Sequence, residues 1–188
     1  MANIEAGRLC PADTLQALIA QGDTGETQHR LDDLIAAYPS DPRLQFLKGS
    51  RLAGQGNYRA ARAAMRRAVD LAPDYVIARF QLGLLELTSG EPIAAQETWG
   101  PLHGLPRDNF VRLFVEGLCH LIRDEFAGAV RCLQDGIALN GENAPMNRDM
   151  QLVIDEIHFK QANGKTGEPA VSSVDLLLQQ AAFKSRKH

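Results

Sequence analysis

The sequence predicts an all-α protein, a solenoid built from repeated helix–turn–helix units. Three columns of like residues recur at a spacing of about 34 residues, namely Phe46, Phe80 and Phe114, then Gly49, Gly83 and Gly117, then Ala61, Ala95 and Ala129. A period of this length corresponds to one pair of packed helices. Aromatic residues make up only 6% of the chain and hydrophobic residues 45%. That composition favours close-packed helices over a sheet and argues against wholesale disorder.

The clearest unit runs from Pro42 to about Tyr75. Its first helix is predicted over 43–53 and ends at a turn rich in glycine and asparagine, residues 54–57. Its second helix is predicted over 58–71, because Pro73 cannot continue the backbone hydrogen bonds of a helix.

Small residues at fixed positions indicate where the helices touch. Two antiparallel helices approach to about 8–10 Å only where the contacting side chains are small. Glycine inside a helix costs roughly 0.5–1 kcal/mol relative to alanine, so three glycines at one register need a packing reason. Gly49 and Ala61 are therefore expected at the contact within the unit, and Ala68 at the contact with the next unit.

These residues resemble the signature of the tetratricopeptide repeat. The first unit carries the matching residues Gly49, Tyr58, Ala61, Ala68 and Pro73. The second carries Leu82, Gly83, Gly90, Ala95 and Trp99, and the third Gly117, Phe126, Ala129, Ile137 and Leu139. The resemblance covers about residues 42–141 and implies a right-handed α-solenoid.

The flanking segments complete the predicted domain organisation. We expect a degenerate first helical repeat over 1–41, three repeats over 42–141, a capping helix within 142–162, a linker over 163–171, and an apolar helix with a basic tail over 172–188. The capping helix is predicted over 146–159, with an apolar stripe of Met150, Val153, Ile154 and Ile157. In the last helix, predicted over 174–184, one face carries Val174, Leu177, Leu178, Ala181 and Ala182.

The middle repeat departs from the pattern. Gly100-Pro101, followed by Gly104 and Pro106, interrupts its second helix. We expect that helix to be short or kinked at this point.

The resemblance implies that the first helices of the repeats line a concave groove for a partner segment. The positions that it assigns to this groove are mostly apolar, namely Phe46, Phe80, Phe114, Ile77, Leu84, Leu87, Val111, Leu118 and Leu121. Family members that clamp the C-terminal carboxylate of heat-shock chaperones use lysine and asparagine in these columns. Here Phe46 and Ser50 occupy such positions, so a carboxylate clamp is not expected.

The phenylalanine column has two interpretations. The rings are core residues, or they form an apolar wall that something must cover, since a soluble monomer rarely exposes so large a patch. The sequence offers three segments that could cover such a wall: an external apolar or amphipathic peptide, the chain's own last helix, or the same helix of a second copy. We favour the chain's own helix or a dimer in the resting state, with an external ligand competing for the groove.

Other chemistries find little support in the sequence. The four residues Arg59, Arg62, Arg66 and Arg67 form a basic stripe that is best read as a solvated helix face, and the net charge of −3 gives no general attraction to nucleic acid. Histidines and cysteines show no metal-ligand spacing, and no acid, base or nucleophile cluster occurs. We therefore expect no enzyme, no cofactor and no metal ion. With no run of 18 apolar residues and no signal-peptide pattern, a cytoplasmic protein without a membrane span is expected.

The predicted function is a non-catalytic protein–protein interaction module. A more specific version is a chaperone of the type III secretion class, which keeps hydrophobic cargo soluble. The alternative is a homo-oligomeric scaffold subunit whose groove is permanently filled by a second copy.

Overall fold

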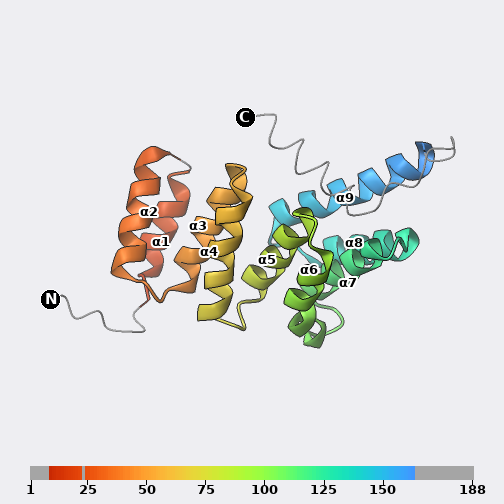
Figure 1. The fold of residues 1–188 in the computed structure, drawn as a ribbon, viewed down its shortest axis with the longest axis horizontal. Coiled ribbons are helices and arrows are strands. Elements are labelled where there is room, and N and C mark those ends of the chain that lie inside the picture. Colours follow the sequence, from red (N-terminus) through yellow and green to blue (C-terminus); the bar gives the residue numbers. More distant parts are fainter. Residues whose placement is uncertain (1–8, 23, 164–188) are drawn as a thin grey trace. The chain divides into compact units, whose positions relative to one another are not determined.

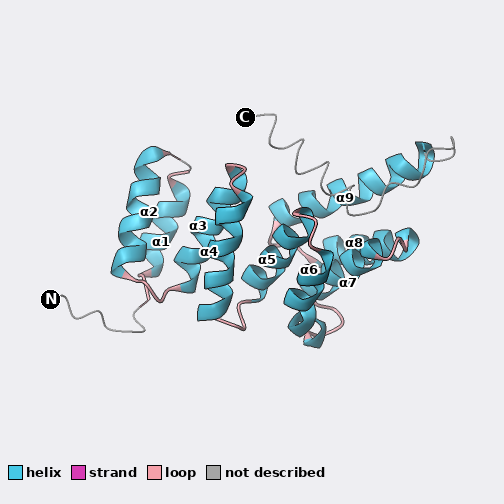
Figure 2. Cartoon of the chain, viewed as in Figure 1, coloured by secondary structure: helices cyan, strands magenta, loops and turns pink. Residues whose placement is uncertain are grey.

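The computed structural model describes residues 9–22 and 24–163, and every regular element within these ranges is a helix (Figure 2). Their order along the chain (Figure 1) is α1 (Ala12–Ala20), α2 (Gly25–Ala37), α3 (Pro42–Gly54), α4 (Tyr58–Leu71), α5 (Val76–Thr88), α6 (Pro92–Trp99), the 3₁₀ helix η1 (Gly100–Gly104), α7 (Phe110–Ile122), α8 (Phe126–Leu139) and α9 (Ala144–Asn163). The predicted all-α class is confirmed. The helix predicted over 174–184 and nearly all of the linker before it lie outside the described residues.

The turns inside the helix pairs repeat as regularly as the helices. The backbone adopts a positive φ at Gly22 (71°), Gly56 (77°), Gly90 (81°) and Asp124 (58°), four positions that follow one another at the repeat period. Glycine reaches this left-handed region without steric cost, which explains three of the four residues. The shared turn also shows that α1 and α2 form a helix pair of the same kind as the later ones.

The chain divides into two compact units, Met1–Leu82 (unit 1) and Gly83–His188 (unit 2). In unit 1 the buried side chains of Cys10, Leu18, Leu31 and Leu44 form one cluster that joins α1, α2 and α3. Helix α3 packs along α4 at Gly49, where a β-carbon would stand 2.8 Å from Cγ of Met65. The missing side chain is therefore what lets these two helices approach.

Polar side chains begin the helices of unit 1. The Thr24 hydroxyl accepts a hydrogen bond from the Thr27 amide, and the Thr27 hydroxyl accepts one from the Thr24 amide, which makes a reciprocal capping box for α2. Asp41 caps α3, whose first residue is Pro42, and Asn57 caps α4. These caps explain why the helices begin where they do.

Unit 2 repeats the close helix contact twice. A β-carbon on Gly83 would stand 2.2 Å from the indole nitrogen of Trp99, and one on Gly117 would stand 2.8 Å from the Leu133 side chain. Helix α6 ends at Trp99 and continues as η1 from Gly100. The short second helix predicted for the middle repeat is thus confirmed, because Pro101 cannot donate the next helical hydrogen bond.

Helix α9 begins at Ala144, one repeat period after the start of α7 at Phe110. One side of it is buried, through Met146, Met150, Val153, Ile154 and Ile157, and it packs against α8. Unlike the helices before it, α9 stays helical through His158, the position where the four earlier turns occur. It is therefore about two turns longer than α7, the first helix of the preceding repeat.

Candidate interaction surface

Three of the predicted groove residues lie partly open to solvent. Phe46 on α3 and Ile77 on α5 are half-buried in unit 1, and Leu84 on α5 is half-buried in unit 2. The ring of Phe46 contacts that of Tyr75, with centroids 5.4 Å apart and planes tilted by 46°. We call Arg43, Phe46, Ser50, Tyr75 and Ile77 the aromatic face of unit 1.

The cation on the aromatic face is engaged by the chain itself. Arg43 donates from Nε to Oδ1 of Asp41 (3.0 Å), and from Nη2 to Oδ2 of Asp41 (2.7 Å) and to the carbonyl oxygen of Cys10 (2.6 Å). Asp41 is fully buried and also accepts from the amides of Cys10 (2.8 Å) and Arg43 (2.9 Å). Arg43 therefore fastens the start of α3 to the segment before α1.

These contacts set the protonation of the groups nearby. Burial acts to raise the pKa of Asp41, but the hydrogen bonds from Arg43 and from the Cys10 amide outweigh it and lower the pKa. Burial raises the pKa of the Tyr75 hydroxyl, against the opposing effect of the Arg43 charge. Asp41 is thus an anion and Tyr75 a neutral phenol at neutral pH.

The Ser50 hydroxyl of the aromatic face is also satisfied internally. It is exposed and donates to the carbonyl oxygen of Phe46 at 3.0 Å, on its own helix. What the aromatic face presents to a ligand is therefore mainly carbon surface, from two rings and one aliphatic side chain. Such a face suits an apolar segment better than a carboxylate or a phosphate.

Six other predicted groove residues are buried. Each exposes 1% of its surface or less, and they are Phe80, Leu87, Val111, Phe114, Leu118 and Leu121. In unit 2, Phe114 stacks edge-on against Phe110 at 5.8 Å and lies beside Gly136 of α8. These six side chains are core residues. Of the three phenylalanines in the repeat column, Phe80 and Phe114 are therefore part of the core, and only Phe46 is partly exposed.

The signature residues of the repeats lie at helix contacts. Ala61, Ala68, Ala95, Trp99 and Ala129 are completely buried. Gly49, Gly83 and Gly117 each face a side chain of the partner helix, as described above. They position the helices and are not available to a ligand.

Sequence reasoning missed two columns of the repeat. In the third repeat the small residue that corresponds to Ala68 is Gly136, two periods later, and not Ile137. A β-carbon on Gly136 would stand 2.6 Å from the Phe114 ring, so the glycine leaves room for that ring. The second missed column is that of the turn glycines, Gly22, Gly56 and Gly90, which the repeat spacing in the sequence also indicates. The capping role of Asp41 recurs two periods later at Asn109, which caps α7, but its bond to Cys10 had no signal in the repeat, because Cys10 belongs to a distant segment of the chain.

The described residues hold no group of three or more histidines, cysteines, aspartates or glutamates placed to bind a metal ion. Burial raises the pKa of the Cys10, Cys119 and Cys132 thiols, which keeps them protonated and weakly nucleophilic. Among the described helices, none combines the length and the apolar character that crossing a bilayer requires.

Comparison with known families agrees with this geometry. Residues 46–96 match the family model described as tetratricopeptide repeat. Over this segment the chain is similar to the tetratricopeptide repeat. The matched segment holds α4, α5, most of α3 and the first part of α6, and it includes the contact between Gly49 and Met65 that brings α3 and α4 together.

Solved structures resemble the chain over nearly its whole length. MamA from Desulfovibrio magneticus RS-1, from residue 41 to its end, is 15% identical, with 93% of this chain and 92% of that one covered at a TM-score of 0.57. The ArsTM double mutant of MamA RS-1 is 14% identical at the same coverage, with a TM-score of 0.56. At this identity the likeness concerns the fold alone, a helical-repeat solenoid. No curated protein matches the chain.

Proposed function

We propose that this helical-repeat protein is a non-catalytic interaction module that binds an apolar or amphipathic segment of a partner protein on the aromatic face of unit 1. The observation that carries the proposal is the half-exposed ring pair of Phe46 and Tyr75. Phe46 lies in a column that the repeat family uses for ligands, and Tyr75 directly precedes α5. Aromatic side chains that are partly exposed on a rigid element are typical anchors of protein interfaces.

The chemistry of the aromatic face limits the kinds of partner segment that can bind there. Arg43 is committed to Asp41 and Cys10, and Ser50 to its own helix. Binding would therefore rest on burial of carbon surface, about 25 cal/mol for each Å² removed from water. A segment with apolar residues on one side, such as an amphipathic helix, meets this requirement.

The proposal is tested by selecting amphipathic peptides from a displayed library against the full chain and measuring the affinity of the best by calorimetry. Ser50→Lys places a long charged side chain on the aromatic face at an exposed position and should weaken binding about tenfold or more. Phe46→Ala should do the same by removing a ring. Arg67→Ala, at an exposed position of α4, is the matched control and should bind like the unmodified chain.

Equal affinity of the selected peptides for the unmodified chain and for both Ser50→Lys and Phe46→Ala would place the binding site elsewhere. Circular dichroism and thermal melting of the variants separate loss of binding from loss of folding. Ser50→Lys is the cleaner variant in this respect, because it removes no buried side chain.

A further inference from the structure

Asn140 follows the last residue of α8 and is hydrogen-bonded at each of its polar groups. Its amide donates to the carbonyl oxygen of Gly136 (3.0 Å), and its own carbonyl oxygen accepts from Nδ2 of Asn147 on α9 (2.8 Å). Its side-chain Nδ2 donates to Oδ1 of Asn147 (2.8 Å) and to the carbonyl oxygen of Asn143 (3.2 Å). Its Oδ1 accepts from the Asn143 amide (3.1 Å), and only 3% of the residue is exposed. We call Asn140, Asn143 and Asn147 the asparagine network, which joins the end of α8 to the start of α9.

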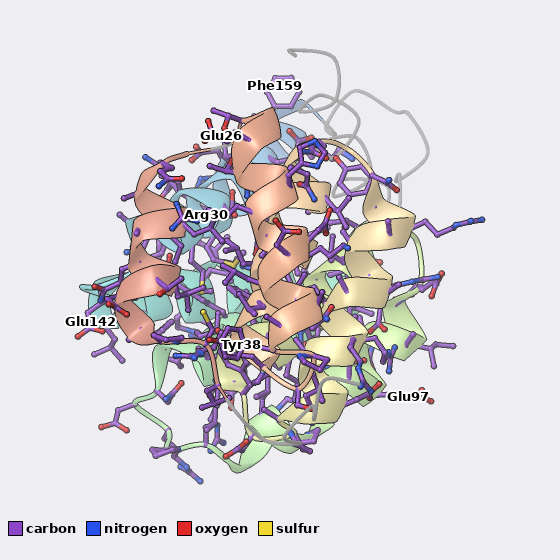
Figure 3. The ribbon with its side chains drawn as sticks, turned by 90° about the vertical axis from the view of Figure 1, so that its left-hand side faces the viewer. Glu26, Arg30, Tyr38, Glu97, Glu142 and Phe159 are labelled. Atoms are coloured by element: carbon purple, nitrogen blue, oxygen red, sulfur yellow. The ribbon has the colours of Figure 1, made fainter. Side chains whose placement is uncertain are left out.

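The residue after Asn140 is a glycine that the backbone and the packing do not require. Gly141 is exposed and does not have a positive φ, and a β-carbon placed on it would meet no atom within 4 Å. Its amide has no backbone acceptor within the described part of the chain. Glu142, the next residue, is exposed and projects outward from the ribbon (Figure 3). The Gly141 amide therefore lies where water has access to it.

Two earlier repeats carry proline at the position of Gly141. Pro39 and Pro73 stand three and two periods before it. Proline has no N–H group, whereas glycine has one. Of these three junctions, only the one before α9 places a reactive backbone N–H next to an asparagine side chain.

An asparagine that is followed by glycine can lose its side-chain amide without an enzyme. The glycine nitrogen attacks Cγ of the asparagine, its proton passes through solvent to the leaving nitrogen, the Cγ–Nδ2 bond breaks, and ammonia leaves as a succinimide ring closes. A water molecule then opens the ring at either carbonyl carbon, which gives aspartate or isoaspartate. Glycine favours this reaction because it has no β-carbon to hinder the approach of its nitrogen.

We propose that Asn140 is a deamidation site whose reaction is held back by the docking of α9. Ring closure requires the Asn140 carboxamide to turn toward the Gly141 nitrogen, and the asparagine network holds that carboxamide by both its oxygen and its nitrogen. Opening of α9 removes Asn147 and frees the side chain to turn. The site lies in unit 2 and goes beyond the function proposed for the aromatic face of unit 1.

Deamidation in turn weakens the docking of α9. In the product a carboxylate oxygen replaces Nδ2 and faces Oδ1 of Asn147 and the carbonyl oxygen of Asn143, which are both acceptors. Two hydrogen bonds are lost, and a buried charge has no donor on that side. Asn147 cannot turn its amide over without giving up its own bond to the Asn140 carbonyl oxygen. The isoaspartate product also lengthens the main chain between α8 and α9.

The rate of conversion in the full chain, followed by peptide mapping and mass spectrometry at mildly alkaline pH, tests the protection. Asn140 should convert at least about tenfold more slowly in the folded chain than in a free peptide of residues 136–147. Asn147→Ala should raise the rate in the folded chain by about fivefold or more, since it removes two bonds of the network. Gly141→Ala should suppress the reaction in both. Peptide mapping separates this site from the chain's other asparagine–glycine pair, at 163–164.

Two control variants separate local opening from other effects. Gln151→Ala removes a different amide from α9, one that donates to Asp155, and should leave the Asn140 rate unchanged. Gly83→Ala weakens another helix contact of the same unit and reports on global unfolding. If it raised the Asn140 rate as much as Asn147→Ala does, global unfolding and not the docking of α9 would control the site, and the proposal would be overturned. A rate in the unmodified folded chain equal to that of the free peptide would overturn it as well.

Asn140→Asp tests the effect of the product on α9 by hydrogen exchange. Amides of 148–160 should exchange at least about tenfold faster than in the unmodified chain, while those of α7 keep their protection. Asn143→Asp is the matched control, because Oδ1 of Asn143 accepts from the Met146 amide at the start of α9, where a carboxylate serves equally well. Unchanged exchange in Asn140→Asp, or an equal increase in Asn143→Asp, would overturn the effect on α9. Neither measurement involves Phe46, so this proposal and the proposed function fail independently.

Discussion

At the scale of single residues, Asp41 does three tasks at once. Its carboxylate caps α3, holds the Arg43 guanidinium at 2.7 Å and accepts the Cys10 amide from the segment before α1. Each bond to the charged form stabilises it, and together they outweigh the cost of burial and lower the pKa. The folded protein therefore depends on Asp41 being ionised.

Asp41→Asn should lower the free energy of unfolding by about 2–3 kcal/mol at neutral pH, since the amide keeps the shape but loses the charge-assisted bonds. A carboxylate with a lowered folded pKa stabilises the protein above its unfolded value, near 3.9, and loses this contribution as the pH falls through the folded value. The difference between the two proteins should thus be constant above about pH 5 and shrink below about pH 4. Urea unfolding across this range measures it. A difference that stays constant down to acid pH would contradict the assignment to Asp41.

Asp124 is the one non-glycine residue with a positive φ in the described chain. A β-carbon in this region costs roughly 1–2 kcal/mol, less for aspartate than for most residues. Asp124→Gly should therefore be more stable than Asp124→Ala by about 1 kcal/mol. Comparing these two variants with each other cancels the loss of the aspartate side chain. Equal melting temperatures would mean that the turn adjusts its backbone.

At the scale of elements, the glycines decide how closely the helices pack. The neighbour differs between the contacts, since Gly49 faces the flexible chain of Met65 whereas Gly83 faces the rigid, fully buried indole of Trp99. A methionine can move aside, but an enclosed indole cannot. The same substitution should therefore have different effects in the two helix pairs.

Gly83→Ala should lower the free energy of unfolding by about 1–3 kcal/mol, because the new methyl group overlaps the indole. Gly49→Ala should cost less than about 1 kcal/mol, since its gain in helix propensity offsets the shift of Met65. Chemical denaturation of the two variants makes the comparison. A larger loss for Gly49→Ala would show that the Met65 side chain is held as firmly as Trp99.

Phe46 and Phe114 occupy the same column of the repeat but differ in burial, so their substitution should also differ in effect. Phe114→Ala should lower the free energy of unfolding by about 3–5 kcal/mol, as expected for a fully buried ring. Phe46→Ala should lower it clearly less, because the Phe46 ring is only half-buried. Thermal or urea unfolding of both alanine variants checks the order. If Phe46→Ala unfolded the protein as severely as Phe114→Ala, the aromatic face would be part of the core.

The elements were largely predictable from the sequence, and the exposure of their faces was not. The second helix of the first repeat, 58–71, and the break at Gly100 were both indicated by local signals, namely glycine, asparagine and proline. The repeat period showed which residues are equivalent, but equivalence does not determine burial. Phe46 and Phe114 share one column, yet the ring of Phe114 lies against Gly136 and is buried, whereas Phe46 stays half-exposed.

At the scale of the whole molecule, a repeat array distributes its stability among neighbouring units. Asp41 fastens elements of unit 1, and Gly83 belongs to unit 2 with its contact at Trp99. The two substitutions share no partner in these contacts. Their effects on the free energy of unfolding should therefore add.

The double variant Asp41→Asn, Gly83→Ala should lose the sum of the two single losses to within about 0.5 kcal/mol. A double-mutant cycle by urea unfolding gives the difference. A deviation well above this margin would show that the two units exchange strain along the chain.

The helix starts have a consequence for how such a chain can change in length. Helices α3, α5, α7 and α9 begin at Pro42, Val76, Phe110 and Ala144, always one full period apart, even though α6 is broken and completed by a 3₁₀ turn. A duplication or excision of one whole period joins a helix end to an equivalent helix start and keeps every later contact in phase. A change of any other length inside a helix rotates the rest of that helix, so that its apolar residues leave the contact face. The gene can therefore gain or lose a unit in a single recombination event, while small insertions are tolerated only in the turns.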